Sequence, residues 1–175
     1  MPRGTYRWGS GAVEEFSCAP GPAGWRWVST GPYGRLDLTL DGTGRQLRVE
    51  LADGGWVLRG GVSAAATTWV RGGAEHSATA AGFTGSSPGL LLAVARGLRL
   101  DPGTGTRVRL VAVTAPALAT RVVDESWELL ATSVYGPLQV SRYRVTPLDT
   151  GEPYELHVTP DVLLTGPDVE LATLS

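Results

Sequence analysis

One short segment of the chain has the spacing of a catalytic serine. Gly85-Ser86-Ser87-Pro88-Gly89 matches the G-x-S-x-G turn of α/β-hydrolases, and acidic residues and then His157 follow in the chain order of their triad. The oxyanion hole of those enzymes needs a backbone N–H directly after the nucleophile, and Pro88 has none. Serine before proline is typical of a helix start, with Ser87 as the N-cap and Pro88 in the first turn. We therefore interpret the motif as a helix cap.

The remaining ionisable residues do not combine into another catalytic or metal-binding pattern. The two histidines lack the short spacing and the neighbouring cysteine pairs of zinc sites. Glu14-Glu15 and Asp124-Glu125 lie in strand-like segments, where adjacent side chains point to opposite faces, so the members of a pair cannot share a cleft. The chain has no lysine, which excludes Schiff-base chemistry and a P-loop. We predict ordinary surface charges, no catalytic residue, no metal and no cofactor.

Aromatic residues are the better candidates for a ligand site. Trp25 and Trp27 are two residues apart, so they face one side of a strand with Arg26 on the other. One interpretation is a core rich in aromatic residues. The other is a concave, aromatic-lined cavity for a lipophilic ligand, in which indole rings supply apolar area and one N–H donor. The candidate ligand-binding residues are Trp25, Trp27, Trp56, Trp69, Trp127 and Tyr143.

The elements that would position these residues are strands. Leucines alternate with polar residues from Arg35 to Leu40, and the alternation resumes at Leu47 after a glycine-containing turn. The segment 106–113 and the later segments 121–130, 138–145 and 154–158 are also strand-like. Residues 87–97 form one apolar segment with a serine-proline start and a glycine end, which predicts a buried helix.

The chain is therefore expected to be mainly β. We predict a curved antiparallel sheet of about 10–13 strands, a half-barrel or β-roll, with the helix in its concavity. All 175 residues form a single domain, with two β-rich halves at about 1–82 and 104–175 joined through the helix.

Composition restricts the partners. The formal net charge is −2 and the arginines are balanced by acids, so no nucleic-acid-binding stripe is expected. The single cysteine excludes an internal disulfide. The N-terminal segment lacks the apolar core of a signal peptide, and no apolar run is long enough for a membrane span. We predict a cytoplasmic protein.

The order of several landmarks resembles a family of uncharacterised bacterial proteins described as glycolipid-binding. The similar features are Trp8, Val13-Glu14-Glu15-Phe16, Trp25, the hairpin at 36–51, Trp56 or Trp69, the segment 83–88, Arg96 and Arg99, Pro116, Tyr143 and Val162-Leu163-Leu164. The family's usual leucine-proline pair and closing tyrosine-proline are absent from this chain. The resemblance implies a curved antiparallel sheet and a glycolipid as ligand.

Two main functional hypotheses follow, and a third is ranked below them. The first is a non-catalytic binding protein that holds an amphipathic, lipid-like molecule in the concavity. The second is an interaction module that presents a sheet face or edge to a protein partner or to a second copy, because open sheet edges pair readily. The third is a small enzyme that uses tyrosine or acidic residues of the concave face. A concavity filled by the helix would favour the second, and a cleft with convergent acids would favour the third.

Overall fold

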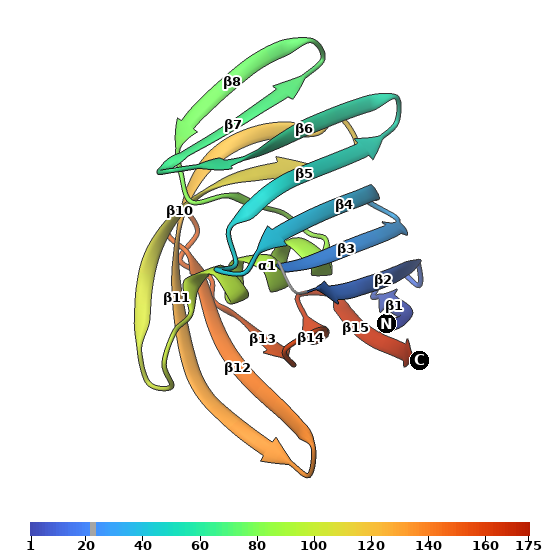
Figure 1. The fold of residues 1–175 in the computed structure, drawn as a ribbon, viewed down its shortest axis with the longest axis vertical. Coiled ribbons are helices and arrows are strands. Elements are labelled where there is room, and N and C mark those ends of the chain that lie inside the picture. Colours follow the sequence, from blue (N-terminus) through green and yellow to red (C-terminus); the bar gives the residue numbers. More distant parts are fainter. Residues whose placement is uncertain (22–23) are drawn as a thin grey trace.

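The computed structural model describes residues 1–21 and 24–175, which form one large sheet and one helix (Figure 1). The sheet has fifteen strands within these ranges, and its only parallel pair there is β9 with β10. The predicted mainly β fold, a curved antiparallel sheet around a buried helix, is confirmed. The strands are more numerous than the 10–13 predicted, because short segments such as β9 and β14 also join the sheet.

The first half of the chain is a meander in which each strand pairs with the next. Its strands are β1 (Arg3–Trp8), β2 (Val13–Gly21), β3 (Gly24–Gly31), β4 (Gly34–Asp41), β5 (Gln46–Asp53), β6 (Trp56–Ser63), β7 (Ala66–Arg71) and β8 (Ala74–Thr79). Alternation of apolar and polar side chains gives each strand one inner and one outer face. On β4, Leu36, Leu38 and Leu40 are buried, whereas the side chains between them face outwards.

The second half continues the sheet after the helix and returns to the first strand. Its elements are β9 (Phe83–Thr84), α1 (Pro88–Leu98), β10 (Gly105–Thr114), β11 (Ala119–Tyr135), β12 (Leu138–Pro147), β13 (Tyr154–Val158), β14 (Leu163–Gly166) and β15 (Val169–Leu174). β15 pairs with β1, so both halves lie in one sheet. The sheet is therefore open, with β8 and β9 as its two edge strands.

Helix α1 lies inside the curve of the sheet (Figure 1). It contacts β3, β4, β9 and β14, and its residues from Pro88 to Ala95 are buried. At Gly89 the helix backbone approaches Trp27 closely, because a Cβ atom there would stand 2.5 Å from the indole. The helix thus fills the middle of the concavity with apolar side chains.

The helix begins at Pro88 as predicted, but the capping role of the Ser87 side chain and the C-terminal end of the helix need correction. Ser87 is the N-cap residue, but its side chain makes no capping hydrogen bond. Its hydroxyl instead donates to Glu14 Oε1 at 3.2 Å. Gly97 does not end the helix. The C-cap is Arg99, which is in the left-handed region with φ of 49° and donates to the Gly42 carbonyl at 2.8 Å, while Leu98 packs against the core.

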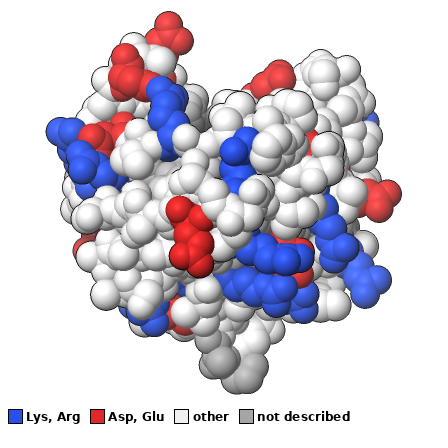
Figure 2. All heavy atoms as spheres, turned by 90° about the horizontal axis from the view of Figure 1, so that it is seen from above, with Lys and Arg blue, Asp and Glu red and all other residues white. Residues whose placement is uncertain are grey.

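The outer surface is mixed in charge. Seen from the β7–β8 side, basic and acidic side chains are interspersed among neutral ones (Figure 2). Many are paired across strands, as Arg26 is with Asp37 at 2.7 Å. No helix in the described ranges is long and apolar enough to cross a membrane.

Candidate ligand-binding cleft

A cleft of about 490 Å³ lies where the two ends of the sheet approach each other. The segment that follows β8 forms one wall, β10 forms another, and the C-terminal half of α1 forms the floor. Its lining includes six buried aliphatic side chains: Val62, Ala80, Ala93, Val94, Val108 and Leu110. We call this space the apolar cleft.

The local sequence explains why the cleft is open and apolar. Small residues line it where larger ones would fill it, including Ala81 and Gly97. On β10, alternation turns Val108 and Leu110 inwards and leaves Arg107 and Arg109 exposed. The segment between β8 and β9 is held beside β10 by a hydrogen bond from Ala81 N to Arg109 O at 2.9 Å.

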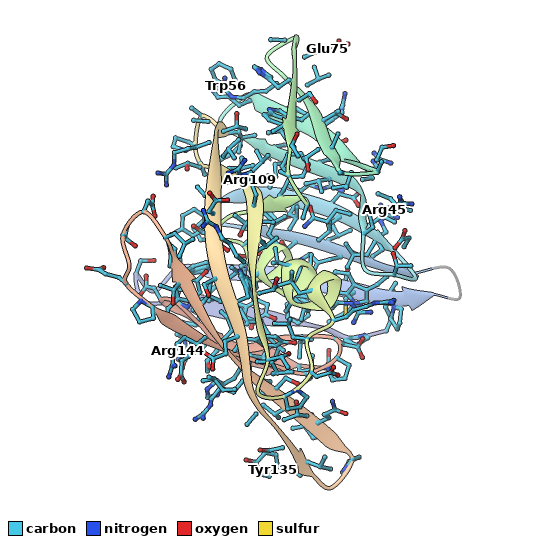
Figure 3. All side chains as sticks on the ribbon, turned by 90° about the vertical axis from the view of Figure 1, so that its left-hand side faces the viewer. Arg45, Trp56, Glu75, Arg109, Tyr135 and Arg144 are labelled. Atoms are coloured by element: carbon cyan, nitrogen blue, oxygen red, sulfur yellow. The ribbon has the colours of Figure 1, made fainter. Side chains whose placement is uncertain are left out.

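The charged groups at the cleft are already paired. Arg107 and Arg109 bind Asp124 at 3.0 Å each, and Arg45 binds Asp41 at 3.2 Å. In Figure 3, Arg109 and Arg45 lie on opposite sides of α1. Hydrogen bonds from Thr43 and Arg45 lower the pKa of Asp41 to about 2, so its carboxylate stays charged. Arg107 and Arg109 share one carboxylate, so these groups leave a single net positive charge at the border of the cleft. The interior of the cleft suits an apolar group better than a strongly charged one.

The predicted aromatic residues do not line this cleft. Trp25, Trp27 and Trp127 are at most 2% exposed and belong to the core, as does Tyr143. Trp25 and Trp27 do share one face, as predicted, and Trp27 stacks on Phe16 with centroids 4.6 Å apart. Their indole N–H groups have no partner among the described residues. These rings stabilise the contact between sheet and helix.

The other two tryptophans lie towards the β6–β8 end of the sheet. Trp69 is 7% exposed, stacks on His76 and borders a groove on β6–β8. Trp56 is 40% exposed and lies under Arg71, whose guanidinium carbon is 4.1 Å from the ring centroid. Arg71 also donates to the Ala117 carbonyl at 2.8 Å, so this stack ties β6 and β7 to the loop after β10.

Two glutamates that were predicted to be surface charges are buried. Strand alternation does separate each pair, but Glu14 is 3% exposed and Glu125 is 6% exposed. Burial raises the pKa of both carboxyls. Hydroxyl groups of Ser29 and Ser87 counteract part of this rise at Glu14, and the indole of Trp127 does so at Glu125. The signal was present in the sequence, since Glu14 alternates in register with Phe16 and Cys18, which are buried.

No family model and no curated protein matches the chain. A solved structure does: the crystal structure of a DUF1089 family protein from Pseudomonas aeruginosa, at 1.80 Å resolution. The two chains are 17% identical, the TM-score is 0.60, and the alignment covers 89% of this chain and 83% of that one. The likeness shows the fold alone. The similarity to glycolipid-binding proteins therefore remains a prediction.

Within the described ranges, no three histidine, cysteine or acidic side chains gather in a way that would hold a metal ion. The histidines are apart from each other on β8 and β13, and His157 lies 3.7 Å from Glu155. Ser87 has a glutamate, not a histidine, as its hydrogen-bond partner. The arrangement of these residues offers no activated nucleophile.

Proposed function

We propose that the protein binds an amphipathic, lipid-like molecule whose apolar part occupies the apolar cleft. The observation that carries this proposal is the aliphatic surface of the cleft, supplied by β6, α1, β10 and the segment after β8. A volume of about 490 Å³ is within the usual range for small-molecule sites. The wall is aliphatic rather than aromatic, and none of the tryptophans lines it.

The proposal is tested by filling the cleft. Ala81 lines the cleft and is exposed, so Ala81→Trp places a large ring in it without disturbing the core. We expect the variant to lose at least tenfold in affinity for the neutral apolar dye N-phenyl-1-naphthylamine, measured by fluorescence titration. The matched control is Ala74→Trp, an exposed alanine on β8 outside the cleft. Equal binding by wild type and Ala81→Trp would contradict the proposal.

Native mass spectrometry addresses the ligand itself. Protein purified under mild conditions should carry an additional mass that organic extraction removes, and Ala81→Trp should carry less of it. Fractionation of the cells that make the protein would test the predicted cytoplasmic location at the same time.

A second candidate function is self-association through the β11–β12 hairpin. This hairpin projects from the body of the molecule, with Tyr135 at its tip (Figures 1 and 3). Val134, Tyr135 and Leu138 are 71%, 65% and 44% exposed. No charged residue occurs from Leu129 to Ser141. An exposed apolar surface of this kind is typical of interaction sites.

A further inference from the structure

A second pocket, of about 430 Å³, lies at the N-terminal end of α1, away from the apolar cleft. β1, β11 and β13 supply Trp8, Glu125 and Tyr154 to its lining. The β3–β4 and β14–β15 turns supply Tyr33 and Asp168. We call this space the Glu125 pocket. The proposed lipid site uses none of these residues.

Glu125 has an unused hydrogen-bonding atom at this pocket. Its Oε2 accepts a hydrogen bond from Trp127 Nε1 at 2.8 Å, and its Oε1 accepts none from the described residues. A carboxyl group that is 6% exposed is costly to ionise unless it is paired. Trp127 is in the core, so the Trp127 bond fixes the orientation of the carboxyl group and leaves Oε1 for a ligand.

The charge around the pocket is negative. Three acidic residues line it, Glu125, Asp149 and Asp168, against one basic residue, Arg121. Arg121 is bound to Asp149 at 2.8 Å, on the exposed side of the pocket. The charges of Glu125 and Asp168 therefore have no basic partner among the described residues that line the pocket, which favours a cationic ligand over an anionic one.

The aromatic residues add a surface that suits an organic cation. Trp8 and Tyr33 pack edge to face with centroids 4.7 Å apart, and both line the pocket. Aromatic rings attract ammonium groups, most strongly where water is excluded. We propose that the Glu125 pocket binds an organic ammonium ion, with Glu125 as the counter-ion and the Trp8–Tyr33 pair as the aromatic wall.

Calorimetric titration with choline tests this proposal. Choline should bind, and its neutral isostere 3,3-dimethyl-1-butanol should bind at least tenfold more weakly, because only choline carries the charge. Glu125→Gln should weaken choline binding at least tenfold. The control Glu128→Gln, on the same strand but paired with Arg144 outside the pocket, should leave it unchanged. The proposal would be overturned if choline did not bind or if the two compounds bound equally well. It would also be overturned if methyl glucoside, an uncharged sugar, bound more strongly than choline.

A second variant separates binding from folding. Tyr33 is 39% exposed, so Tyr33→Ala removes part of the aromatic wall without opening the core, and we expect a several-fold loss of choline affinity. Ala81→Trp should leave choline affinity unchanged, which makes this site distinguishable from the lipid site. Unaltered choline binding in both Glu125→Gln and Tyr33→Ala would place the cation elsewhere and overturn the assignment.

The pH dependence of choline binding gives a third measurement. The other titratable or charged groups that line the pocket are Tyr33, Arg121, Asp149, Tyr154 and Asp168. Burial raises the pKa of Glu125, and a bound cation favours its ionised form, so binding should release a proton and should tighten as the pH rises. Calorimetry in buffers of different ionisation enthalpy measures this release, and Glu125→Gln should abolish it. If choline bound without proton release at every pH tested, the role of Glu125 would be overturned.

Discussion

At the scale of single residues, the buried glutamates make stability depend on pH. The pKa of Glu14 is raised above its ordinary value of 4.5, mainly by burial. The folded protein therefore holds this proton more strongly than the unfolded chain does. The stabilisation from this group is fully present below the pKa that Glu14 has in the unfolded chain, and it is lost as the pH rises through the pKa in the folded protein. Between these two pKa values the free energy of unfolding falls by about 1.4 kcal/mol per pH unit.

Glu14→Gln tests this dependence, because glutamine has no proton to lose and keeps the shape of the protonated side chain. We expect the free energy of unfolding of the variant to fall less than that of the wild type between pH 5 and pH 7. Urea denaturation at several pH values measures the difference. Glu15→Gln, the exposed neighbour on the opposite face of β2, is the control. If wild type and Glu14→Gln showed the same dependence of unfolding free energy on pH, the pKa of the buried carboxyl would not be raised in the folded protein.

At the scale of elements, the contact between helix and sheet depends on one glycine. A Cβ atom at residue 89 would stand 2.5 Å from Trp27 Cδ1 and Nε1, and both the indole and the helix backbone are held by the surrounding core. Alanine favours helices over glycine by about 1 kcal/mol. Forcing an extra methyl group into a packed core costs roughly 1–3 kcal/mol. The steric cost should exceed the gain in helix propensity.

We therefore expect Gly89→Ala to lower the free energy of unfolding by up to about 2 kcal/mol. Urea or thermal unfolding measures this change. Gly42→Ala is the control, since nothing lies within 4 Å of a Cβ atom at that exposed position. A Gly89→Ala variant more stable than the wild type would show that the helix can move away from Trp27 without loss.

The elements also show what the sequence is able to predict. Period-two alternation predicts the strands well, because most strands bury one face inside the curve of the sheet and turn the other face to water. The helix is predictable from its apolar run and the serine-proline start. Its C-terminal end is not, because Leu98 and the Arg99–Gly42 hydrogen bond extend it beyond Gly97 through contacts with a distant turn.

The position of the candidate site is harder to predict from the sequence. Alternation correctly places Trp25 and Trp27 on one face, but it does not tell whether that face meets a cavity or a helix. Three-dimensional packing decides this, since α1 occupies the space in front of Trp27. The apolar residues that line the cleft are alanines, valines, leucines and glycines, and these residues are so common in any core that they give no signal in the sequence.

At the scale of the whole molecule, the two ends of the chain pair in the middle of one open, curved sheet, where β1 lies next to β15. Arg3 and Ser175 exchange two backbone hydrogen bonds, of 2.9 and 2.8 Å. The meander is interrupted only between β8 and β9, and the apolar cleft lies at this interruption. The position of the proposed lipid site is thus a consequence of the topology.

The β11–β12 hairpin also departs from the regular pairing of the sheet. β10 pairs with β11 as far as Glu128, and Leu129 forms backbone hydrogen bonds with Gly103 and Thr104. β13 pairs with β12 only from Ser141, so beyond these points both outer edges of the hairpin lack a partner strand among the described residues. Natural edge strands are commonly protected by charged side chains. This one carries no charge over thirteen residues, from Leu129 to Ser141. An uncharged edge does not repel an identical edge, so a second copy of the chain can pair with it across a twofold axis.

We therefore expect the protein to form a dimer as its concentration rises, and Val134→Lys to abolish it. A lysine at this position puts two like charges next to each other at the twofold contact and obstructs strand pairing. Sedimentation velocity over a concentration series measures the association. Val57→Lys is the control, because Val57 is an exposed valine on β6, far from the hairpin in the sheet order. A wild type that stays monomeric at all concentrations, or a Val134→Lys variant that still dimerises, would rule out the hairpin as the dimer contact.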